Sequence, residues 1–300
     1  MEATPLNDGK NDRRSVLMYV TSMLIFGTIG LFRRYIPVSS AFLACFRGLL
    51  GGMLLWLFTR LKHKSGPQKL STRTLLWLAL SGAVIGVNWM LLFEAYNHTT
   101  VAIATLCYYM QPTIVVLLSP LFFRERLTAR KAVCAAVAIV GMVLVSGVLN
   151  GETPQAGNLR GILQGLGAAV CYAAVIIMNK KLPGIDAYQK TTVQLLSAGI
   201  VMIPYFLLTE GFSVGEFQLT GFLLLLTVGI LHTGIAYVLY FGSMDGLKAQ
   251  SIAMLSYIDP VTALLLSALV LREPLHPTGI IGAIMIIGSA VVSELQSNRQ

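Results

Sequence analysis

The chain has 300 residues, of which 55% are hydrophobic and only 12% are charged, and its mean hydropathy is +0.73. Charged residues make up about a quarter of a typical soluble domain, so this composition excludes a water-soluble protein and indicates an integral membrane protein. The formal net charge of +9 comes from Lys and Arg clusters between apolar runs, so it does not indicate a nucleic-acid partner.

Apolar runs recur along the chain, and each is long enough to be a membrane-crossing helix at about 1.5 Å of rise per residue through about 30 Å of hydrocarbon. They predict an all-α integral membrane protein with ten transmembrane helices, in chain order at residues 16–32, 39–59, 74–95, 101–123, 129–149, 159–179, 188–208, 219–242, 249–271 and 278–292.

The distribution of basic residues predicts how these helices are oriented. With the N-terminus inside, the Lys and Arg residues that fall outside are only Arg33, Arg34, Arg160 and Arg272. Cytoplasmic loops carry an excess of Lys and Arg. We therefore predict a multi-pass protein of the cytoplasmic membrane with both tails, residues 1–15 and 294–300, in the cytoplasm.

The two halves of the chain repeat each other at an offset of 148 residues. The least common residues that match in register are Tyr109 with Tyr257, Pro112 with Pro260, Arg124 with Arg272 and Glu125 with Glu273. The repeat predicts two five-helix units, 16–149 and 159–293, joined by an outer linker at 150–158. Five is an odd number, so the second unit must be inverted in the membrane. Inverted repeats of this kind surround a central substrate site near the bilayer midplane.

The segments YYMQPTIVVLLSPLFFRERL and SYIDPVTALLLSALVLREPL close the fourth predicted helix of each unit. They resemble the paired pattern of the drug/metabolite transporter superfamily, in its EamA-type branch. Gly27 and Arg47 stand where that family has Gly in its first helix and Arg in its second. The resemblance covers residues 16–292 and implies a ten-helix carrier whose cavity is lined by the first, third, fourth, sixth, eighth and ninth helices. It implies no single substrate, because the family moves amino acids, sugars, nucleoside-like metabolites and amphipathic drugs.

A polar residue followed by proline stands in the middle of the fourth helix of each unit, as Gln111-Pro112 and Asp259-Pro260. Asp259 is 11 residues from Lys248, which is about 16 Å deep. A carboxylate there costs about 2.5 to 3.5 kcal/mol, and each proline frees a backbone carbonyl that needs a partner. Both pairs therefore predict a water-accessible cavity wall. Asp259 either contacts substrate or takes up a proton, or it pairs with a buried donor and holds two helices together.

Three further ionisable residues lie within predicted helices. His232 is at a depth similar to Asp259, so it either relays a proton or is a neutral, hydrogen-bonded imidazole. Arg47 needs a partner inside the membrane, and we favour a structural ion pair over a clamp for a substrate carboxylate. Glu94 is either an interfacial carboxylate or a contact at a gate. The candidates for proton coupling are Asp259, His232 and Glu94.

Several aromatic residues are too deep for the interfacial belts that normally collect Trp and Tyr. We expect part of this set to form an aromatic box around an organic substrate, with a cation-π contact if the substrate carries an ammonium group. The predicted substrate-binding residues are Trp89, Tyr108, Tyr109, Gln111, Tyr172, Tyr237, Tyr257 and Asp259. A structural role is expected for Arg47, Pro112, Pro260, Arg124, Glu125, Arg272 and Glu273. The four cysteines lie within helices without metal-ligand spacing, so no metal, disulfide or cofactor is expected.

These features predict a secondary carrier for small organic molecules, and the family resemblance implies amino acids or related amphipathic metabolites, moved in the export direction. No phosphate-binding loop is present, and no catalytic motif indicates an enzyme. A multidrug or quaternary-amine exporter of the same fold is one alternative, and a channel or receptor-like membrane protein is another. Proton-driven transport and facilitated diffusion both remain open. The expected partners are a small-molecule substrate and the lipid bilayer, without nucleic acid, in a monomer or weak dimer.

Overall fold

The computed structural model describes residues 13–62, 68–123, 127–146, 156–209, 219–244, 246–274 and 276–297, and these residues form helices without a strand. The helices are, in chain order, α1 (Arg13–Gly27), α2 (Ile29–Tyr35), α3 (Ser40–Lys62), α4 (Thr72–His98), α5 (Val101–Tyr108), α6 (Gln111–Phe123), α7 (Ala129–Val145), α8 (Ala156–Lys180), α9 (Ala187–Thr209), α10 (Leu219–Thr227), the π-helical segment η3 (Val228–Ile235), α11 (Ala236–Met244), α12 (Ala249–Ser256), α13 (Ile258–Leu269) and α14 (Pro277–Ser297).

Among the described residues, seven helical stretches have the length and apolar composition needed to cross a membrane. They are Arg13–Tyr35, Ser40–Leu61, Thr72–His98, Val101–Phe123, Asn158–Lys180, Ala187–Leu208 and Leu219–Met244. The stretches Met254–Leu269 and Pro277–Ser293 are apolar but shorter, and α7 has 17 residues. The expected all-helical membrane fold is therefore confirmed. Helices lie at each of the ten predicted positions.

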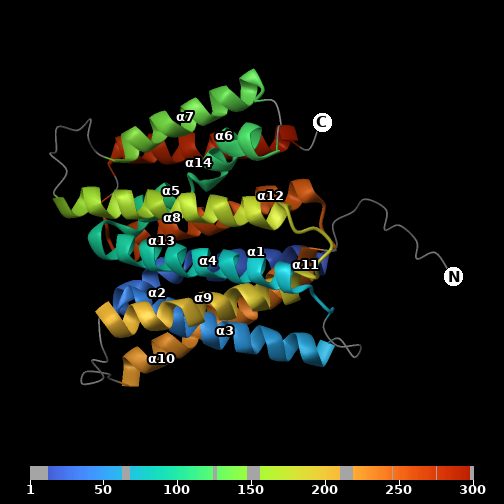
Figure 1. Ribbon diagram of the computed structural model, residues 1–300. Helices are drawn as coiled ribbons and strands as arrows, with labels where there is room; N and C mark the ends of the chain where they lie inside the picture. Colours follow the sequence, from blue (N-terminus) through green and yellow to red (C-terminus); the bar gives the residue numbers. More distant parts are fainter. Residues whose placement is uncertain are drawn as a thin grey trace.

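The helices run side by side in one bundle (Figure 1). The closest packing joins α3 to α9, α4 to both α8 and α9, and α7 to α14, which lie together along one edge. The start of α1 and the ends of α3 and α8 lie at one end, which we call the basic end after Arg13, Arg60 and Lys180. The ends of α2 and α4 lie at the other, which we call the Glu273 end.

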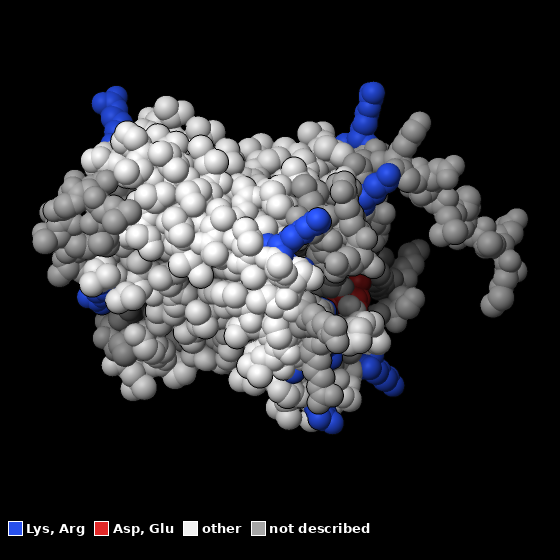
Figure 2. Space-filling view, turned by 90° about the horizontal axis from the view of Figure 1, so that it is seen from above, with Lys and Arg blue, Asp and Glu red and all other residues white. Residues whose placement is uncertain are grey.

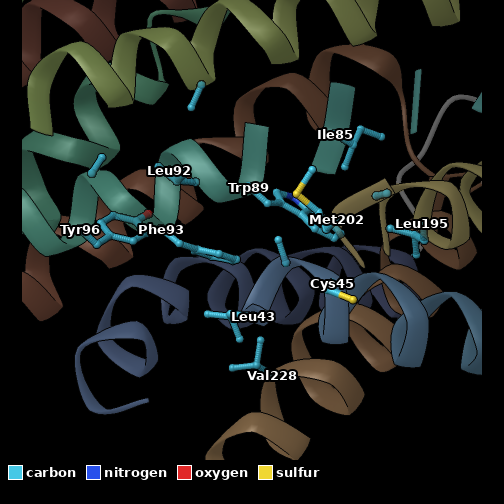
Figure 3. Packing of buried hydrophobic residues seen from close by; sticks show 14 of the residues in the cluster. Leu43, Cys45, Ile85, Trp89, Leu92, Phe93, Tyr96, Leu195, Met202 and Val228 are labelled. Atoms are coloured by element: carbon cyan, nitrogen blue, oxygen red, sulfur yellow. The ribbon is translucent and has the colours of Figure 1, made fainter. Parts of the chain in front are cut away.

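Two apolar clusters form the interior of the bundle. The larger one includes Leu43, Trp89, Phe93 and Leu195 from α3, α4 and α9 (Figure 3). The smaller one joins residues of α5, α7, α8 and α14. The outward-facing residues are apolar as well, as at Leu208, which is 86% exposed. An exterior of this kind is expected where lipid replaces water around a helix bundle.

Charged side chains are sparse on the face shown in Figure 2, and Lys and Arg gather mainly at one end of it. Between the two ends lies a broad band of uncharged atoms. This arrangement agrees with a membrane-embedded middle and a cation-rich surface at the basic end.

Proline interrupts the predicted fourth helix of each unit near its middle. The first interruption separates α5 from α6 at Tyr109 and Met110, and α6 begins at Gln111. The second separates α12 from α13 at Tyr257, and α13 begins at Ile258, one residue before Asp259. A proline cannot donate a backbone hydrogen bond to the preceding turn, so a new helix begins within two residues before each proline. The interruptions place Gln111 and Asp259 in the first turns of α6 and α13.

Two other predicted helices are also irregular. The predicted helix at residues 16–32 is split at Thr28, whose hydroxyl donates to the carbonyl of Ile25 at 2.7 Å. The predicted helix at residues 219–242 contains η3, where Thr233 Oγ1 donates to the carbonyl of Val228 five residues earlier at 3.3 Å. Irregular backbone at membrane depth is tolerated where it is buried in protein or lines a cavity. These interruptions therefore point to the interior of the bundle as the place of the site.

Candidate functional site

A cavity of about 500 Å³ lies inside the bundle. Its wall contains every predicted substrate-binding residue, namely Trp89, Tyr108, Tyr109, Gln111, Tyr172, Tyr237, Tyr257 and Asp259. The resemblance implied walls from the first, third, fourth, sixth, eighth and ninth predicted helices, and all six contribute. The second and seventh contribute too, through Arg47 of α3 and through Lys190, Gln194 and Leu195 of α9.

Asp259 is held by a residue of the other half of the chain. The hydroxyl of Tyr109 donates a hydrogen bond of 2.6 Å to Asp259 Oδ2. Among the described residues no other hydrogen bond or ion pair to its carboxylate is recorded, so Oδ1 is left for the cavity. The position in the first turn of α13 adds the partial positive charge of a helix N-terminus, which stabilises a carboxylate.

Gly27 lets α1 pack closely against the backbone of α13 at Asp259. A Cβ atom at Gly27 would lie 2.7 Å from the backbone oxygen of Asp259 and 2.6 Å from Cβ of Thr262. Only a residue without a side chain lets the two helices approach so closely. The glycine that the resemblance singled out therefore packs directly behind Asp259.

Gln111 occupies the corresponding place in the first half of the chain. It lines the cavity, and its Oε1 atom is buried without a hydrogen-bond partner in the described structure. A buried amide oxygen without a partner costs about 1 to 3 kcal/mol. Gln111 and Asp259 thus both belong to the cavity wall.

Arg47 lies in the cavity wall and is only 6% exposed. Its Nε donates to Thr233 Oγ1 at 2.8 Å, and its guanidinium carbon lies 4.1 Å from the ring centroid of Trp89. Within the described parts of the chain, no carboxylate lies within 4.0 Å of it. The structural ion pair that we favoured for Arg47 is therefore not formed with any described residue. A hydroxyl and an aromatic face take its place.

Aromatic rings form much of the remaining wall. Tyr108 lies 5.7 Å from Tyr172 and 5.9 Å from Tyr109 between ring centroids, and Tyr237 stacks on Phe241 at 5.9 Å. These distances are within the range of favourable aromatic pairs. The rings therefore hold one another in place around the cavity, as an aromatic box requires.

His232 and Glu94 do not belong to the cavity wall. His232 is fully buried, its Nε2 lies 2.7 Å from Thr28 Oγ1, and its ring packs edge-on against Phe32 at 4.8 Å. Glu94 lies at the Glu273 end, where it accepts hydrogen bonds from Ser40 and Asn97 and lies 3.6 Å from His98. Of the three candidates for proton coupling, the structure places only Asp259 at the cavity.

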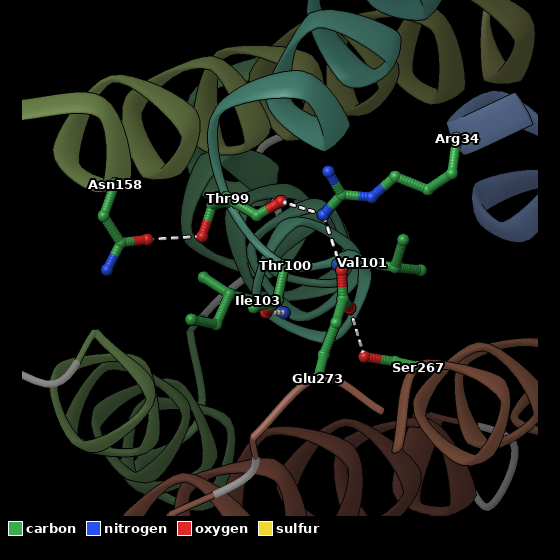
Figure 4. A network of polar contacts seen from close by, with 8 residues as sticks. All are labelled: Arg34, Thr99, Thr100, Val101, Ile103, Asn158, Ser267 and Glu273. Atoms are coloured by element: carbon green, nitrogen blue, oxygen red, sulfur yellow. Dashed lines mark hydrogen bonds and ion pairs between the residues drawn. The ribbon is translucent and has the colours of Figure 1, made fainter. Parts of the chain in front are cut away.

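A polar network joins several helices at the Glu273 end (Figure 4). Glu273 forms an ion pair of 2.5 Å with Arg34 of α2 and accepts from the backbone N–H of Val101 at 2.8 Å and from Ser267 at 2.5 Å. Arg34 also donates to the carbonyl of Thr99 at 2.8 Å. The network therefore ties the end of α13 to α2 and to the α4–α5 connection.

The other residues for which we expected a structural role do not belong to this network in the described structure. Arg272 is exposed, with a φ of 54°, and forms no ion pair among the residues that the structure describes. Arg124 and Glu125 lie outside the described residues. Pro112 and Pro260 adjoin the two helix interruptions described above. Of the two Arg-Glu pairs, only Glu273 is therefore seen to take part in the polar network of the described residues.

The cavity also contains polar residues that the sequence did not single out. Gln194 donates to Asn179 Oδ1 at 2.8 Å and to Ser81 Oγ at 2.7 Å. Lys190 lines the same region near the start of α9, where the exposed residue Ala187 also belongs to the wall. The cavity therefore reaches the surface at the basic end. The signal for Gln194 was a lone amide inside an apolar run, which does not by itself distinguish a cavity residue from a buried hydrogen bond.

No group of three or more His, Cys, Asp or Glu side chains that could hold a metal ion occurs among the described residues. Cys45, Cys107, Cys134 and Cys171 are free thiols. The groups that line the cavity include aromatic faces, a carboxylate, a guanidinium and amides.

Comparison with known proteins finds relatives of this chain, among them a protein named as a transporter. The chain is 28% identical over 296 residues to the uncharacterized transporter YxxF of Bacillus subtilis (strain 168), covering 98% of this chain and 93% of that protein. It is 28% identical over 224 residues to Protein PecM of Dickeya dadantii (strain 3937), covering 72% of this chain and 73% of PecM. A solved crystal structure with 22% identity shares its fold with a TM-score of 0.63, over 95% of this chain and 99% of that one.

The model of the EamA-like transporter family matches residues 13–147 and residues 159–294. These two segments span nearly the whole chain, and they contain the paired segments on which the resemblance rested. Together with the apolar helices, the match identifies a multi-pass membrane protein. The chain belongs to the EamA-like transporter family, within the drug/metabolite transporter superfamily.

Proposed function

We propose that the protein is a secondary carrier that exports small organic metabolites, amino acids or related amphipathic compounds, across the cytoplasmic membrane. The observation that carries this proposal is the cavity of about 500 Å³ with aromatic walls and a few convergent polar groups. Cavities of a few hundred cubic ångströms with such walls bind small organic ligands. The predicted substrate-binding residues are therefore proposed to contact the substrate.

We propose that the helices form two inverted five-helix units, residues 16–149 and 159–293. In support, one family model matches two successive segments of the chain. The interruptions at Tyr109 and Tyr257 also fall at equivalent positions of the two halves. In inverted-repeat carriers, interrupted helices surround the substrate near the midplane.

Alternating access is proposed from the difference between the two ends of the bundle. At the Glu273 end, Glu273, Arg34, Thr99 and Val101 are joined to one another. At the basic end, the cavity reaches exposed Ala187. With both termini in the cytoplasm, as the basic loops support, this arrangement is the inward-open state. Opening the Glu273 end and closing the basic end would then move the substrate outward.

The alternatives differ in what they require of the cavity. A quaternary-amine exporter needs a carboxylate and aromatic faces, which Asp259 and the tyrosines supply, but it has no use for Arg47. We therefore place the metabolite carrier first. As partners we propose a small-molecule substrate and the lipid bilayer, with the chain acting as a monomer or weak dimer.

Uptake into proteoliposomes tests the proposal. Labelled amino acids, nucleosides and quaternary amines are offered with and without an imposed pH gradient, and protein-free liposomes serve as the control. Saturable uptake of at least one amino acid or related metabolite is the expected result. Uptake of quaternary amines alone would favour the multidrug alternative, and uptake that never saturates would indicate a channel.

A further inference from the structure

Arg47 presents an unbalanced positive charge to the cavity. It is almost fully buried at 6% exposure, and the described residues place no carboxylate within 4.0 Å of it. Buried charges in proteins are normally paired, because removing an unpaired ion from water costs several kcal/mol. The charge of Arg47 is therefore either balanced by something that enters the cavity or carried at a considerable cost.

The contacts of Arg47 hold the guanidinium in a fixed place without neutralising it. Thr233, which η3 turns inward, accepts from Nε at 2.8 Å. The ring of Trp89 lies 4.1 Å from the guanidinium carbon, and that of Phe93 lies 5.8 Å away. No hydrogen-bond partner within the described structure is recorded for the two terminal amino groups. They are the pair of donors that binds a carboxylate in a bidentate manner.

Asp259 forms no direct ion pair with Arg47. It lines the same cavity, but its recorded partner is the hydroxyl of Tyr109, and it lies beyond 4.0 Å from Arg47. The cavity wall thus contains Arg47 and Asp259, which form no direct ion pair, with Lys190 as a second cation near the basic end. A molecule that carries both charges can satisfy both groups, and a simple organic cation leaves Arg47 unpaired.

We infer that Arg47 binds an anionic group of the transported molecule, a carboxylate in the simplest case, and thereby determines specificity. The inference rests on the proposed function, because it takes the cavity to be the substrate site. It narrows the substrate class to molecules with an acidic group and, through Asp259, favours dipolar molecules over monocations.

Matched probes that differ in one carboxylate test this inference. Suitable pairs are phenylalanine and phenylalaninamide, leucine and leucinamide, and glycine betaine and choline. Transport in proteoliposomes is compared for the wild-type protein, Arg47→Gln, Arg47→Lys and Thr233→Val. Arg60→Gln is the matched control, because Arg60 lies on the same helix and also packs on a tryptophan, Trp56, at 5.3 Å, but it lies outside the cavity wall.

Binding is measured independently of transport. The chain has three tryptophans, and Trp56→Phe with Trp77→Phe leaves Trp89, which packs on the guanidinium, as the only tryptophan, whose fluorescence is excited selectively over that of tyrosine. A probe whose carboxylate binds Arg47 changes the fluorescence of Trp89 at a lower concentration than its partner without the carboxylate.

In the wild-type protein and in the control variant Arg60→Gln, we expect KM or Kd to be about 10- to 100-fold lower for the carboxylate-bearing probe than for its partner. This is the range for a charged hydrogen-bonded contact. In Arg47→Gln this preference falls to about onefold, while transport of the partner without the carboxylate remains. Arg47→Lys keeps the charge but not the planar pair of donors, so it retains part of the preference. Thr233→Val raises KM for the carboxylate-bearing probe.

A wild-type protein that accepts both members of each pair equally overturns the inference and leaves the carrier proposal intact. An Arg47→Gln or Arg47→Lys variant that keeps the full preference for the carboxylate-bearing probe also overturns the inference and leaves the carrier proposal intact. If no probe is transported but the carboxylate-bearing probes still bind through Arg47, the carrier proposal fails and only the binding of a carboxylate by Arg47 stands. Absence of both transport and binding for every pair overturns both.

Discussion

Glu273 at the end of α13 and Arg34 of α2 form an ion pair of 2.5 Å that ties the two halves of the chain together at one end of the bundle. The Glu273 side chain is only 12% exposed, and it also accepts hydrogen bonds from Val101 and Ser267. A pair that must separate whenever this end opens contributes to the balance between the two states of a carrier.

The first prediction concerns this ion pair. Glu273→Gln removes its charge, so we expect the state open at the Glu273 end to gain about fivefold or more in population. The measurement is labelling of a single cysteine at Ile29 of the cavity wall by an impermeant thiol reagent added from that side. The exchange Arg34→Glu with Glu273→Arg restores the ion pair and should restore the original labelling. Unchanged labelling in Glu273→Gln would contradict a closing role.

The second prediction concerns Asp259. Asp259→Asn and Asp259→Ala remove the carboxylate from the cavity, and we expect each to raise the KM of an ammonium-bearing substrate by about tenfold or more. Tyr109→Phe removes one hydrogen bond to the carboxylate but leaves its charge, so its effect should be smaller. Kinetics of uptake in proteoliposomes provide the measurement. If rate, affinity and pH dependence are all unchanged in both Asp259 variants, the carboxyl group has no functional role.

The third prediction separates His232 from Asp259 in any response to protons. His232 is fully buried, bonded to Thr28 and outside the cavity wall. We therefore expect His232→Gln to respond to an imposed pH gradient as the wild-type protein does. The comparison is made as a ratio of accumulation with and without the gradient, which corrects for a lower amount of folded protein. A ratio that changes in His232→Gln would instead support a relay through the imidazole.

The fourth prediction concerns the contact between α7 and α14. Gly282 packs against the backbone oxygen of Gly141, and a Cβ atom there would also lie 2.8 Å from Cγ2 of Val145. Gly282→Ala should destabilise the fold by about 1 to 3 kcal/mol, the usual cost of overpacking. The measurement is the temperature at which the detergent-solubilised protein loses its monodisperse state.

Gly288→Ala is the matched control on the same helix, because a Cβ atom at Gly288 would meet nothing within 4 Å. Alanine favours a helix over glycine by up to about 1 kcal/mol, so this variant should be as stable as the wild-type protein or more so. Equal losses in both variants would show that the tight contact between α7 and α14 is not the cause.

The arrangement of apolar runs predicted the helices well, because hydropathy reports directly on which segments can be surrounded by lipid. The two polar-Pro pairs were expected to free a backbone carbonyl each, but the sequence analysis gave residues 101–123 and 249–271 as unbroken helices, and the structure interrupts both of them near these prolines. Asp259 and Gln111 could be assigned to a cavity wall, since a polar group at mid-depth needs a partner other than lipid.

Other features depend on how distant segments pack. The bond from Tyr109 to Asp259 crosses between the two halves, and no local pattern specifies which tyrosine faces the carboxylate. The partner of Arg47 was expected to be acidic, but η3 brings Thr233 and not a carboxylate to it. A π-helical segment has no clear sequence signal. His232 was a candidate for proton coupling with Asp259, but it packs against Thr28 and lies outside the cavity wall.

The most direct test of an alternating-access carrier is countertransport in proteoliposomes loaded with unlabelled substrate. We predict that substrate inside accelerates the entry of labelled substrate, with saturation on both sides, because each return of a loaded cavity exposes the site again. Entry that is linear in concentration and indifferent to the substrate on the far side would contradict a carrier and indicate a channel.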